Sequence, residues 1–259
     1  MELNQLYRQN ATFRDYPHIE ATYKEITEYL KNRKALHKTG RAVGRIYDQA
    51  VLYHTPGIDF KGKKVCEVGG RDGGFASWLT GICEHVTVSD YFELWGKGTE
   101  HDLGSYDYWK DRWLAWAVNP ERLSTGIEDI TKLSYPDNHF DITICTSVIE
   151  HMYPQNFNKG GGDISGIREL VRITKPGGYI LLSTDMTTLG KSGWYSGTYF
   201  YDEVDLFDRI IGPSRCELVG PYNFDFNHPD NNEITYFNRI GAKIGSVVFA
   251  LKKGDKLSP

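Results

Sequence analysis

The chain has 259 residues and a formal net charge of -4, so acidic and basic residues are nearly in balance. This charge excludes a general attraction to nucleic acid or to anionic membrane surfaces. A chain of this length fits one α/β domain with additions, and it buries roughly three quarters of its unfolded surface without disulfides or metals. The first residues are polar, unlike a signal peptide, and no apolar run is long enough to span a membrane. We therefore expect a soluble protein.

Neither the cysteines nor the histidines form a pattern that predicts a disulfide or a metal site. The four cysteines are Cys66, Cys83, Cys145 and Cys216, and none belongs to a C-x-x-C pair. We interpret them as buried, reduced thiols, which suits a cytoplasmic protein. His228 lies close to Asp225 and Asp230, but this spacing matches no established metal signature, so we interpret the segment as a surface turn.

Residues 1–55 precede the first expected strand and predict two amphipathic helices. Apolar side chains recur at helical spacing in the first helix, at Ile19, Tyr23, Ile26 and Leu30. The second helix contains Val43, Ile46, Tyr47, Ala50 and Val51, and Pro56-Gly57 follows it. We expect residues 1–55 to form a helical extension and residues 56–259 to form the main domain. The pattern leaves open whether the extension covers a ligand edge as a lid or packs as a structural addition.

The stretch from Lys64 to Phe75 predicts a strand, a glycine-rich turn and the start of a helix. A short apolar run ends in Glu67, closely spaced glycines follow, and an apolar segment begins at Phe75. Such a turn lets a ligand lie against bare backbone at the carboxyl end of a parallel strand. Glycine suits the turn because it adopts positive φ and has no Cβ to block the ligand.

The second expected strand, residues 86–90, ends in Asp90. A βαβ unit places an acidic residue at this distance from the glycine turn, where a carboxylate accepts hydrogen bonds from both hydroxyls of a ribose. An acid at the end of a strand is common by chance. Its coincidence with the glycine turn favours a nucleotide-type ligand.

The rest of the chain predicts alternating strands and helices. Residues 92–120 are rich in tryptophan and carry mixed charges, so we expect a helix with its Trp face on the sheet rather than a nucleic-acid surface. One further helix is expected to start near Asp163, and another to span residues 202–211 with Val204, Phe207 and Ile211 facing inward. Strands are expected at residues 123–128, 142–147, 179–184, 216–222 and 246–252. This order predicts an α/β fold with a doubly wound, mostly parallel seven-stranded sheet, whose last two strands pair antiparallel at an edge.

Six segments resemble the motifs of class I S-adenosylmethionine-dependent methyltransferases, in the order of that family and over about residues 60–185. They are Glu67-x-Gly69-x-x-x-Gly73, Asp90, Asp129-Ile130, Leu133 to Asp141, Ser147 to His151 and Lys175 to Gly178. Each motif is weak alone, whereas the ordered set is specific. The resemblance is to the broad small-molecule branch, the methyltransferase type 11-like proteins. It implies a Rossmann-like methyltransferase fold and S-adenosyl-L-methionine as cofactor.

The resemblance also implies which residues hold that cofactor. They are Glu67, Gly69, Gly70, Arg71, Gly73, Asp90, Tyr91, Asp129, Ile130, Ser147 and Val148. The glycines would approach the amino-acid part with Glu67 orienting it, Asp90 would hold the ribose beside Tyr91, and Asp129 and Ile130 would contact the adenine. Ser147 and Val148 would pass close to the methyl end. Glu67 can instead cap the following helix, and Ile130 can be ordinary core.

Arg71 departs from the family pattern, because it stands where the middle glycine usually lies. We expect Gly70 to supply the flexibility of that glycine. The Arg71 side chain is expected to point either to solvent or towards the carboxylate of the methionine part.

Methyl transfer from a sulfonium is an in-line displacement, so the protein contributes mainly positioning and water exclusion. An oxygen nucleophile also loses a proton, and His151 is our first candidate for the base, with Asp185 second. Both follow strands at the carboxyl edge of the sheet, although His151 can instead be a structural hydrogen-bonding residue. The aromatic residues expected either in an acceptor pocket or in the core are Trp194, Tyr195, Tyr199 and Tyr201.

Taken together, the sequence predicts an S-adenosylmethionine-dependent methyltransferase that acts on an oxygen or nitrogen of a small molecule or glycan. A non-catalytic S-adenosylmethionine-binding module is an alternative. A nicotinamide-dependent oxidoreductase is less favoured, because Arg71 interrupts a Gly-x-Gly-x-x-Gly fingerprint. Methylation of nucleic-acid bases is not expected, since no Asn/Asp-Pro-Pro-aromatic motif follows the fourth strand. Neither the acceptor nor the oligomeric state can be read from the sequence.

Overall fold

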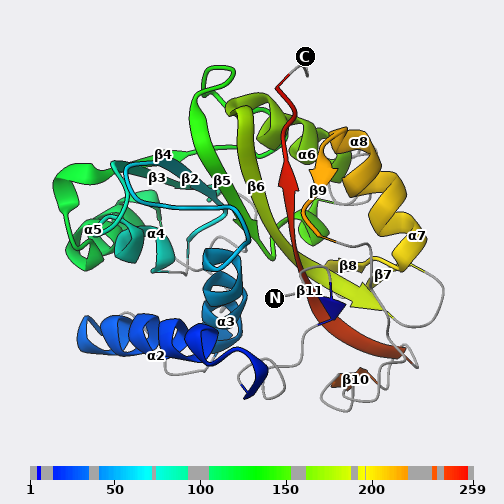
Figure 1. The fold of residues 1–259 in the computed structure, drawn as a ribbon, viewed down its shortest axis with the longest axis horizontal. Coiled ribbons are helices and arrows are strands. Elements are labelled where there is room, and N and C mark those ends of the chain that lie inside the picture. Colours follow the sequence, from blue (N-terminus) through cyan, green and yellow to red (C-terminus); the bar gives the residue numbers. More distant parts are fainter. Residues whose placement is uncertain are drawn as a thin grey trace.

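The structure of the chain, a computed structural model, describes residues 5–6, 14–34, 41–71, 74–92, 105–152, 162–187, 192–195, 197–220, 235–237 and 242–255. A twisted sheet runs through the centre of the molecule, with helices on both of its faces (Figure 1). Its strands are β1 (Gln5–Leu6), β2 (Lys64–Val68), β3 (His85–Asp90), β4 (Leu123–Ile127), β5 (Phe140–Thr146), β6 (Thr174–Thr187), β9 (Glu217–Leu218), β10 (Thr235–Phe237) and β11 (Ala242–Lys252). A separate hairpin consists of β7 (Gly193–Tyr195) and β8 (Thr198–Phe200).

The helices fall in two groups along the chain. The helices of the first half are α2 (Pro17–Asn32), α3 (Arg41–Tyr53), α4 (Phe75–Leu79), α5 (Tyr106–Trp116) and the short 3₁₀ helix η1 (Pro120–Arg122). Those of the second half are the 3₁₀ helix η2 (Ile149–His151), α6 (Gly162–Ile173), α7 (Glu203–Leu206), the π-helix η4 (Phe207–Ile211) and α8 (Gly212–Ser214).

The sheet has the topology of a doubly wound α/β fold. From one edge the strand order is β4-β3-β2-β5-β6-β11. The first five of these strands run parallel, and β11 runs antiparallel to β6. The chain proceeds outward from β2 to β4 and then returns to place β5 on the other side of β2, so the strand order reverses between β2 and β5. Ligands of such sheets bind at the carboxyl ends of the strands beside this reversal.

All seven expected strands occur, and two short unpredicted strands, β1 and β10, join them. The outer edge of β11 pairs antiparallel with β10, β1 and β9 in succession, which confirms the expected antiparallel edge. These three strands come from distant parts of the chain and together cover backbone groups that a long edge strand would expose. Strands of two or three residues are too short for sequence periodicity to reveal.

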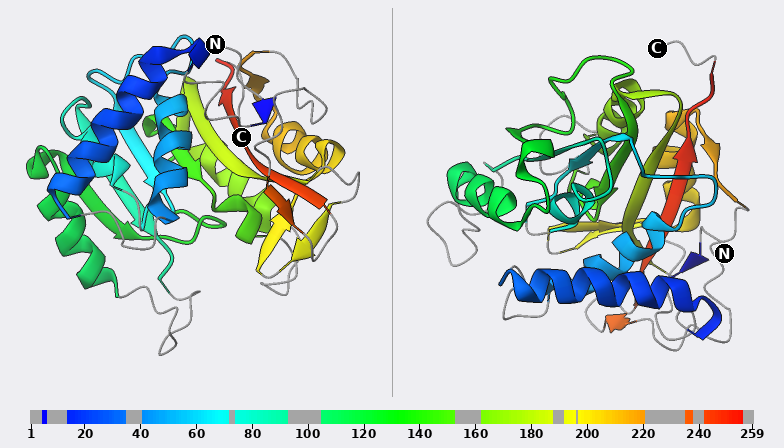
Figure 2. Two further views of the ribbon diagram at one scale, coloured as in Figure 1. Left: turned by 90° about the horizontal axis from the view of Figure 1, so that it is seen from below. Right: turned by 60° about the vertical axis from the view of Figure 1, so that its left-hand side comes forward.

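Successive side chains of each strand point to opposite sides of the sheet, and both faces of the sheet are hydrophobic. In β2, Val65 packs into the cluster that includes α2, α3, α4 and α5, whereas the next residue, Cys66, packs into the cluster with α6, α7 and η4. Val248 and Val247 of β11 divide between the two clusters in the same way. Figure 2 shows these two groups of helices on either side of the sheet.

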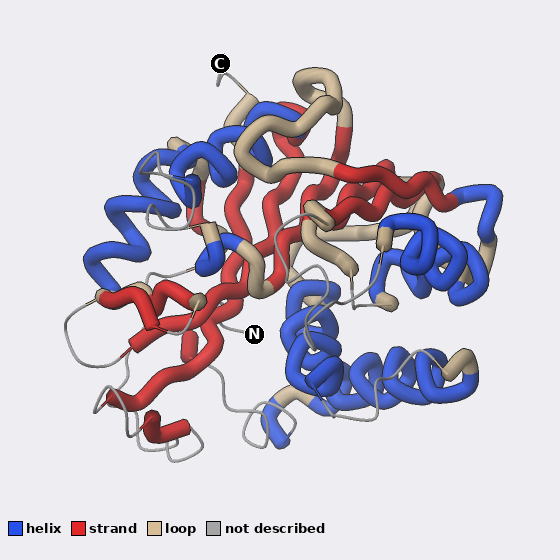
Figure 3. Tube along the Cα trace, turned by 180° about the vertical axis from the view of Figure 1, so that it is seen from behind, coloured by secondary structure: helices blue, strands red, loops and turns tan. Residues whose placement is uncertain are grey.

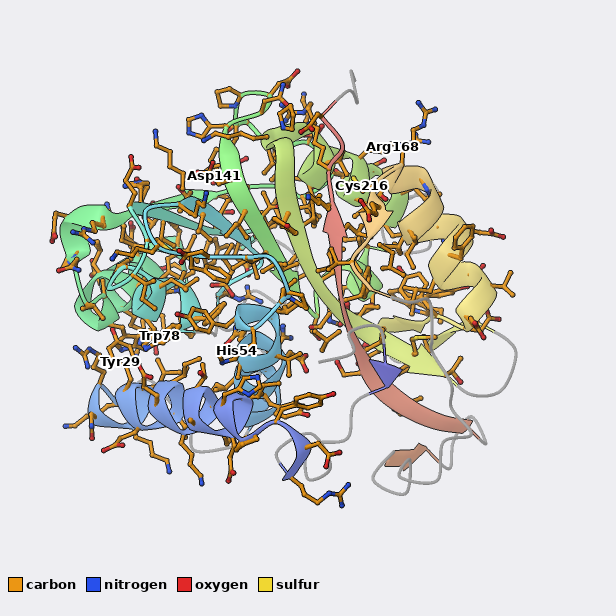
Figure 4. All side chains as sticks on the ribbon, viewed as in Figure 1. Tyr29, His54, Trp78, Asp141, Arg168 and Cys216 are labelled. Atoms are coloured by element: carbon orange, nitrogen blue, oxygen red, sulfur yellow. The ribbon has the colours of Figure 1, made fainter. Side chains whose placement is uncertain are left out.

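Helix α2 forms an outer layer over α3, α4 and α5, and it projects below the sheet together with α3 (Figure 3). Its buried apolar residues include Ile19, Ile26 and Leu30, as predicted. Three hydrogen bonds hold it: Thr22 Oγ1 with His54 Nε2 (2.8 Å), Trp78 Nε1 to Glu25 Oε1 (3.2 Å), and the Tyr29 hydroxyl to the carbonyl of Trp116. Figure 4 labels Tyr29, His54 and Trp78 at this interface. The helix is thus held to the domain by both apolar packing and hydrogen bonds.

The tryptophan-rich segment forms α5, which is shorter than the expected range. Ser105 caps the helix by accepting a hydrogen bond from the amide of Tyr108. Trp109, Trp113 and Trp116 are buried in the core on that side of the sheet. The expected Trp face is therefore confirmed, and residues 93–104 lie outside the described chain.

The helix expected over residues 202–211 is present but differs in register. It begins as α7 and continues as the π-helix η4, whose wider turn changes which side chains face the core. Leu206, Ile210 and Ile211 are buried, whereas Val204 is 67% exposed and Phe207 49% exposed. The prediction was right for Ile211 and wrong for Val204 and Phe207, because the buried face of this helix runs through Leu206 and Ile210 instead.

Within the described residues, no helix has the length and apolarity needed to cross a membrane. Cys66, Cys83 and Cys145 are buried free thiols, as expected, whereas the free thiol of Cys216 is only half-buried. No group of three or more His, Cys, Asp or Glu side chains in the described part of the chain is arranged to hold a metal ion. The segment with Asp225, His228 and Asp230 lies outside the described residues.

A buried ion pair joins α6 to the π-helix η4. Asp163, expected to cap α6, is fully buried, and its carboxylate accepts hydrogen bonds from Nε (2.8 Å) and Nη2 (2.7 Å) of Arg209. The Tyr201 hydroxyl donates to the same carboxylate (3.1 Å), as does the amide of Ile164 (2.9 Å). Burial of this charge is tolerated because several donors replace the water it has lost.

Replacing Arg209 should therefore destabilise the protein strongly. We expect Arg209→Ala to lower the free energy of unfolding by about 3 kcal/mol, because it leaves a buried carboxylate without its cation. The matched control is Arg168→Ala on α6, which removes an exposed arginine (Figure 4) and should change stability by less than about 0.5 kcal/mol. Urea unfolding followed by circular dichroism measures both, and equal effects would contradict the assigned role of the ion pair.

Candidate active site

The turn after β2 packs directly against the segment after β5. Gly69 has φ of +81°, and a Cβ on it would lie 2.2 Å from Cγ2 of Val148. The amides of Gly69 and Gly70 both donate to the carbonyl oxygen of Ser89 in β3, at 2.8 and 3.1 Å. The structure thus brings the ends of β2, β3 and β5 together, and only glycine fits at position 69 without strain.

The glycine turn is also covered from the outside by α2. A Cβ on Gly74 would lie 2.1 Å from Cδ2 of Leu30, so the helix rests on bare backbone there. Gly73, assigned to the cofactor by the family resemblance, lies outside the described residues.

Glu67 is buried (1% exposed) and caps the helix that follows the turn. Its Oε2 accepts a hydrogen bond from the amide of Ala76 (3.0 Å), in the first turn of α4. Its Oε1 accepts one from Nε2 of Gln49 on α3 (3.3 Å). The capping interpretation of Glu67 therefore accounts for the position of its side chain.

Arg71 does not point to solvent. It is 5% exposed, its amide donates to Oδ2 of Asp90 (3.2 Å), and its Nη1 lies 4.0 Å from Oδ1 of the same carboxylate. The guanidinium also lies 5.7 Å from the ring centroid of Phe92, a cation–π arrangement. The residue at the middle-glycine position is thus a partner of the predicted ribose-binding acid. Tyr91 follows Asp90 and is half-buried.

Asp129 and Ile130 follow β4, the strand next to β3, so they lie at the same edge of the sheet as Asp90. Oδ1 of Asp129 accepts hydrogen bonds from the amide (2.8 Å) and hydroxyl (2.7 Å) of Thr131, which fixes the carboxylate in a tight turn. Ile130 is 3% exposed and packs against Gly166 in the core beneath α6. Packing in the hydrophobic core therefore accounts for the position of the Ile130 side chain.

Ser147 directly follows β5 and has φ of +51°, in the left-handed region that non-glycine residues seldom adopt. Its amide donates to the carbonyl oxygen of Ser183 in β6 (2.9 Å). Nη1 of Arg45, on α3, donates to the carbonyl oxygens of Thr146 (2.6 Å) and Ser147 (3.1 Å). Helix α3 is therefore tied to the end of β5. In many proteins, strained backbone conformations such as that of Ser147 occur at active sites and at contacts with ligands.

His151 ends η2, three residues after Val148. Its Nδ1 lies 2.8 Å from the carbonyl oxygen of Gly197, in the turn between β7 and β8. Tyr199 and Tyr201 are buried in the core, with Trp194 partly buried against it, so the core interpretation holds for these three aromatics.

Asp185, the second candidate base, lies near two other carboxyl groups, those of Asp48 on α3 and Glu150 in η2. Burial and the charges of Glu150 and Asp48 raise the pKa of Asp185 to about 8, against the opposing effect of Arg45. Burial likewise raises the pKa of Asp48 to about 7, although hydrogen bonds from Ser183 and Ser246 oppose the shift. Three acids from three elements thus share one region with one arginine.

Three charged residues of this region, Arg45, Asp48 and Glu150, were not predicted from the sequence as site residues. Arg45 and Asp48 lie three residues apart on a helix whose neighbouring residues are mostly apolar. Two charged residues on a largely buried helix are a sequence pattern that indicates a functional role. Glu150 was included in a family motif without a role of its own. Its fully buried side chain could be recognised only once β6 was placed beside it.

Comparisons with known proteins agree with this architecture. Residues 66–182 match the sequence model of a family described as methyltransferase domain, and no curated protein matches the chain. One similar solved structure is an S-adenosylmethionine-dependent methyltransferase from Mesorhizobium loti, with 13% sequence identity and a TM-score of 0.50 over 78% of this chain and 96% of that one. A second is the 1,6-didemethyltoxoflavin-N1-methyltransferase of Burkholderia thailandensis, with 14% identity and a TM-score of 0.54 over 93% of this chain and 90% of that one. A third is a geranyl diphosphate methyltransferase, with 12% identity and a TM-score of 0.56 over 85% of this chain and 84% of that one.

At these identities the solved structures establish the shared fold, and the family match covers residues 66–182. This segment is a methyltransferase domain, with the fold of the S-adenosylmethionine-dependent methyltransferases. Such a domain is that of an enzyme, and its cofactor is S-adenosyl-L-methionine.

The contact between Gly69 and Val148 predicts a specific coupling. Gly69→Ala should lower the free energy of unfolding by about 3 kcal/mol, since it combines left-handed strain with overpacking against Val148. In a Val148→Ala background the same change should cost only the strain, about 1–2 kcal/mol. Urea unfolding of the four proteins of this double-mutant cycle measures the coupling, and strict additivity would contradict the contact.

The raised pKa of Asp48 predicts a pH dependence of stability. The unfolded Asp48 ionises near pH 4 and the folded one near pH 7, so the folded state holds the extra proton in this window. Its contribution to stability therefore falls as pH rises from about 4 to about 7, by up to about 1.4 kcal/mol per pH unit. Asp48→Asn should flatten this decline in thermal unfolding, whereas Asp111→Asn, on the exposed side of α5, should not. Parallel curves for Asp48→Asn and the unchanged protein would refute the burial of an ionisable Asp48.

Proposed function

We propose that the protein transfers a methyl group from S-adenosyl-L-methionine to an oxygen or nitrogen of a small molecule or glycan. The observation that carries the proposal is the meeting of three strand ends at one edge of the sheet. There Asp90 ends β3, Asp129 follows the neighbouring parallel strand β4, and the Gly69 turn packs against Val148. This is the edge at which doubly wound sheets bind nucleotides.

The residues at this edge fit an adenosyl ligand. Asp90 and Asp129 are partly exposed carboxylates, so each can accept hydrogen bonds from hydroxyl or amino groups. Arg71 has a buried Nε without a hydrogen-bond partner among the described residues, which leaves a donor at the side of Asp90. In the proposed assignment Asp90 holds the ribose with Tyr91 beside it, and Asp129 contacts the adenine. The turn at Gly69, Gly70 and Gly73, with Ser147 and Val148 opposite, holds the amino-acid part.

Bound S-adenosyl-L-methionine supplies a methyl group that is already activated for displacement. The protein therefore needs to hold the acceptor in line, exclude water and remove a proton where the acceptor carries one. His151 is positioned through Nδ1 by the Gly197 carbonyl, which favours the tautomer that keeps Nε2 as the proton-accepting nitrogen. Asp185, with its pKa raised to about 8, is matched to proton transfer near neutral pH. We assign the base role to one of these two side chains.

Two finer features belong to the same proposal. The buried, unpaired thiols of Cys66, Cys83 and Cys145 suit a cytoplasmic location. Residues 1–55 are proposed as a helical extension of the domain formed by residues 56–259, and α3 of the extension contacts the end of β5 through Arg45. That contact supports a role for part of the extension at the edge of the sheet where a lid would act.

Calorimetric titration with S-adenosyl-L-methionine tests the proposal directly. We expect binding in the micromolar range, and about tenfold weaker binding to Asp90→Asn, because one charged hydrogen bond to the ribose is lost. Asp111→Asn on α5 removes an exposed acid of the same kind and should bind as the unchanged protein does. No measurable binding would remove the proposed function. Binding without methyl transfer to any acceptor would instead indicate a non-catalytic binding module.

A further inference from the structure

Three carboxyl groups gather beyond the end of β5, on the acceptor side of the proposed site. Asp48 comes from α3, Glu150 from η2 and Asp185 from β6. The charge of Glu150 acts on both aspartates, and Asp48 also acts on Asp185. Arg45 is the cation that opposes these effects at both sites. With every group ionised, three negative charges therefore face one positive charge.

Glu150 has a carboxylate oxygen that no described residue satisfies. Its side chain is fully buried, Oε2 accepts a hydrogen bond from Thr184 Oγ1 (3.1 Å), and Oε1 has no donor within the described part of the chain. A buried, unpartnered carboxylate oxygen is costly and requires an explanation. A bound ligand with a hydrogen-bond donor would satisfy this oxygen and so explain its burial.

The position of these acids links them to the methyl acceptor. Asp185 lies two residues beyond Ser183, whose carbonyl accepts the amide of Ser147. Arg45 contacts the carbonyl of Ser147 and shares α3 with Asp48. The acids therefore lie beside the Ser147–Val148 segment, where the proposed function places the methyl end.

We infer that Asp48, Glu150 and Asp185 form a binding site for a cationic acceptor, an organic ammonium group whose nitrogen is methylated. This inference rests on the proposed function and narrows its acceptor to amines. An ammonium group supplies N–H donors to the unpartnered oxygen of Glu150 and balances the excess of carboxylates. A metal ion is a weaker occupant, because the described side chains include no group arranged to coordinate one.

The same acids can prepare the nitrogen for reaction. An ammonium has no lone pair, so it must first give one proton to a carboxylate, for which Asp185 is suited by its position and its raised pKa. The neutral amine then forms the N–C bond with its lone pair, while the methyl–sulfur bond breaks and its electron pair stays on sulfur. The products are a methylated ammonium and a neutral thioether, and the proton remains on the carboxylate until solvent removes it.

Matched acceptors test the inference. The full chain is incubated with radiolabelled S-adenosyl-L-methionine and with pairs of probes of similar shape, benzylamine with benzyl alcohol and ethanolamine with ethylene glycol. A small-molecule extract, separated into cationic, neutral and anionic fractions, provides natural acceptors. We expect label in the amines or in the cationic fraction, at least tenfold above the matched alcohols or the other fractions.

Two conservative variants and a control complete the experiment. Asp185→Asn and Glu150→Gln should each raise KM for the amine or cationic fraction at least tenfold, while calorimetric binding of S-adenosyl-L-methionine stays within about twofold. Asp111→Asn should leave KM unchanged. Label confined to neutral or anionic acceptors, or unchanged KM in both variants, would overturn the ammonium site but leave the methyltransferase proposal intact. Failure to bind S-adenosyl-L-methionine, or no transfer to any fraction, would overturn the proposed function as well.

Discussion

The close contact between the turn after β2 and the segment after β5 is the constraint on which the rest of the structure depends. Gly69 and Val148 approach so closely that a Cβ on the glycine cannot be accommodated, and the turn must leave the strand with positive φ. Hydrogen bonds from Gly69 and Gly70 to Ser89 tie the same turn to β3. Three strand ends are thereby fixed at one edge. This determines where the acid that ends β3 and the acid that follows β4 lie relative to the segment after β5.

The amino-terminal helix α3 supplies side chains to the carboxyl edge of the sheet. Helix α3 reaches it with Gln49, which donates to Glu67, and with Arg45, which donates to the carbonyls of Thr146 and Ser147. Asp48 on the same helix brings a carboxyl group towards Glu150 and Asp185. A helix outside the matched family segment therefore provides charge near the end of β5, on the proposed acceptor side. This is where methyltransferases of one fold can differ in what they bind.

Arg71 shows how a departure from a family pattern can be accommodated. A glycine at its position would leave room beside Asp90, whereas the arginine fills that space, becomes buried and pairs with the carboxylate. The ion pair is loose at 4.0 Å, and Phe92 supports the guanidinium from another side. In the proposed cofactor site, Arg71 would orient Asp90 while the acid binds the ribose. The flexibility that the turn requires comes from Gly69, which alone of Gly69, Gly70 and Arg71 has positive φ.

The amino-acid sequence by itself determined the order of strands and helices, the glycine turn and the acids at the strand ends, because these depend on local periodicity and turn chemistry. It also indicated the class of enzyme, through motifs that each span only a few residues. Only the tertiary structure decided that Arg71 pairs with Asp90, that Val204 and Phe207 face outward, and that three short strands cover β11. It alone brought Asp48, Glu150 and Asp185 together, because contacts between residues far apart in the chain depend on how α3, η2 and β6 pack and leave no periodic trace in the sequence.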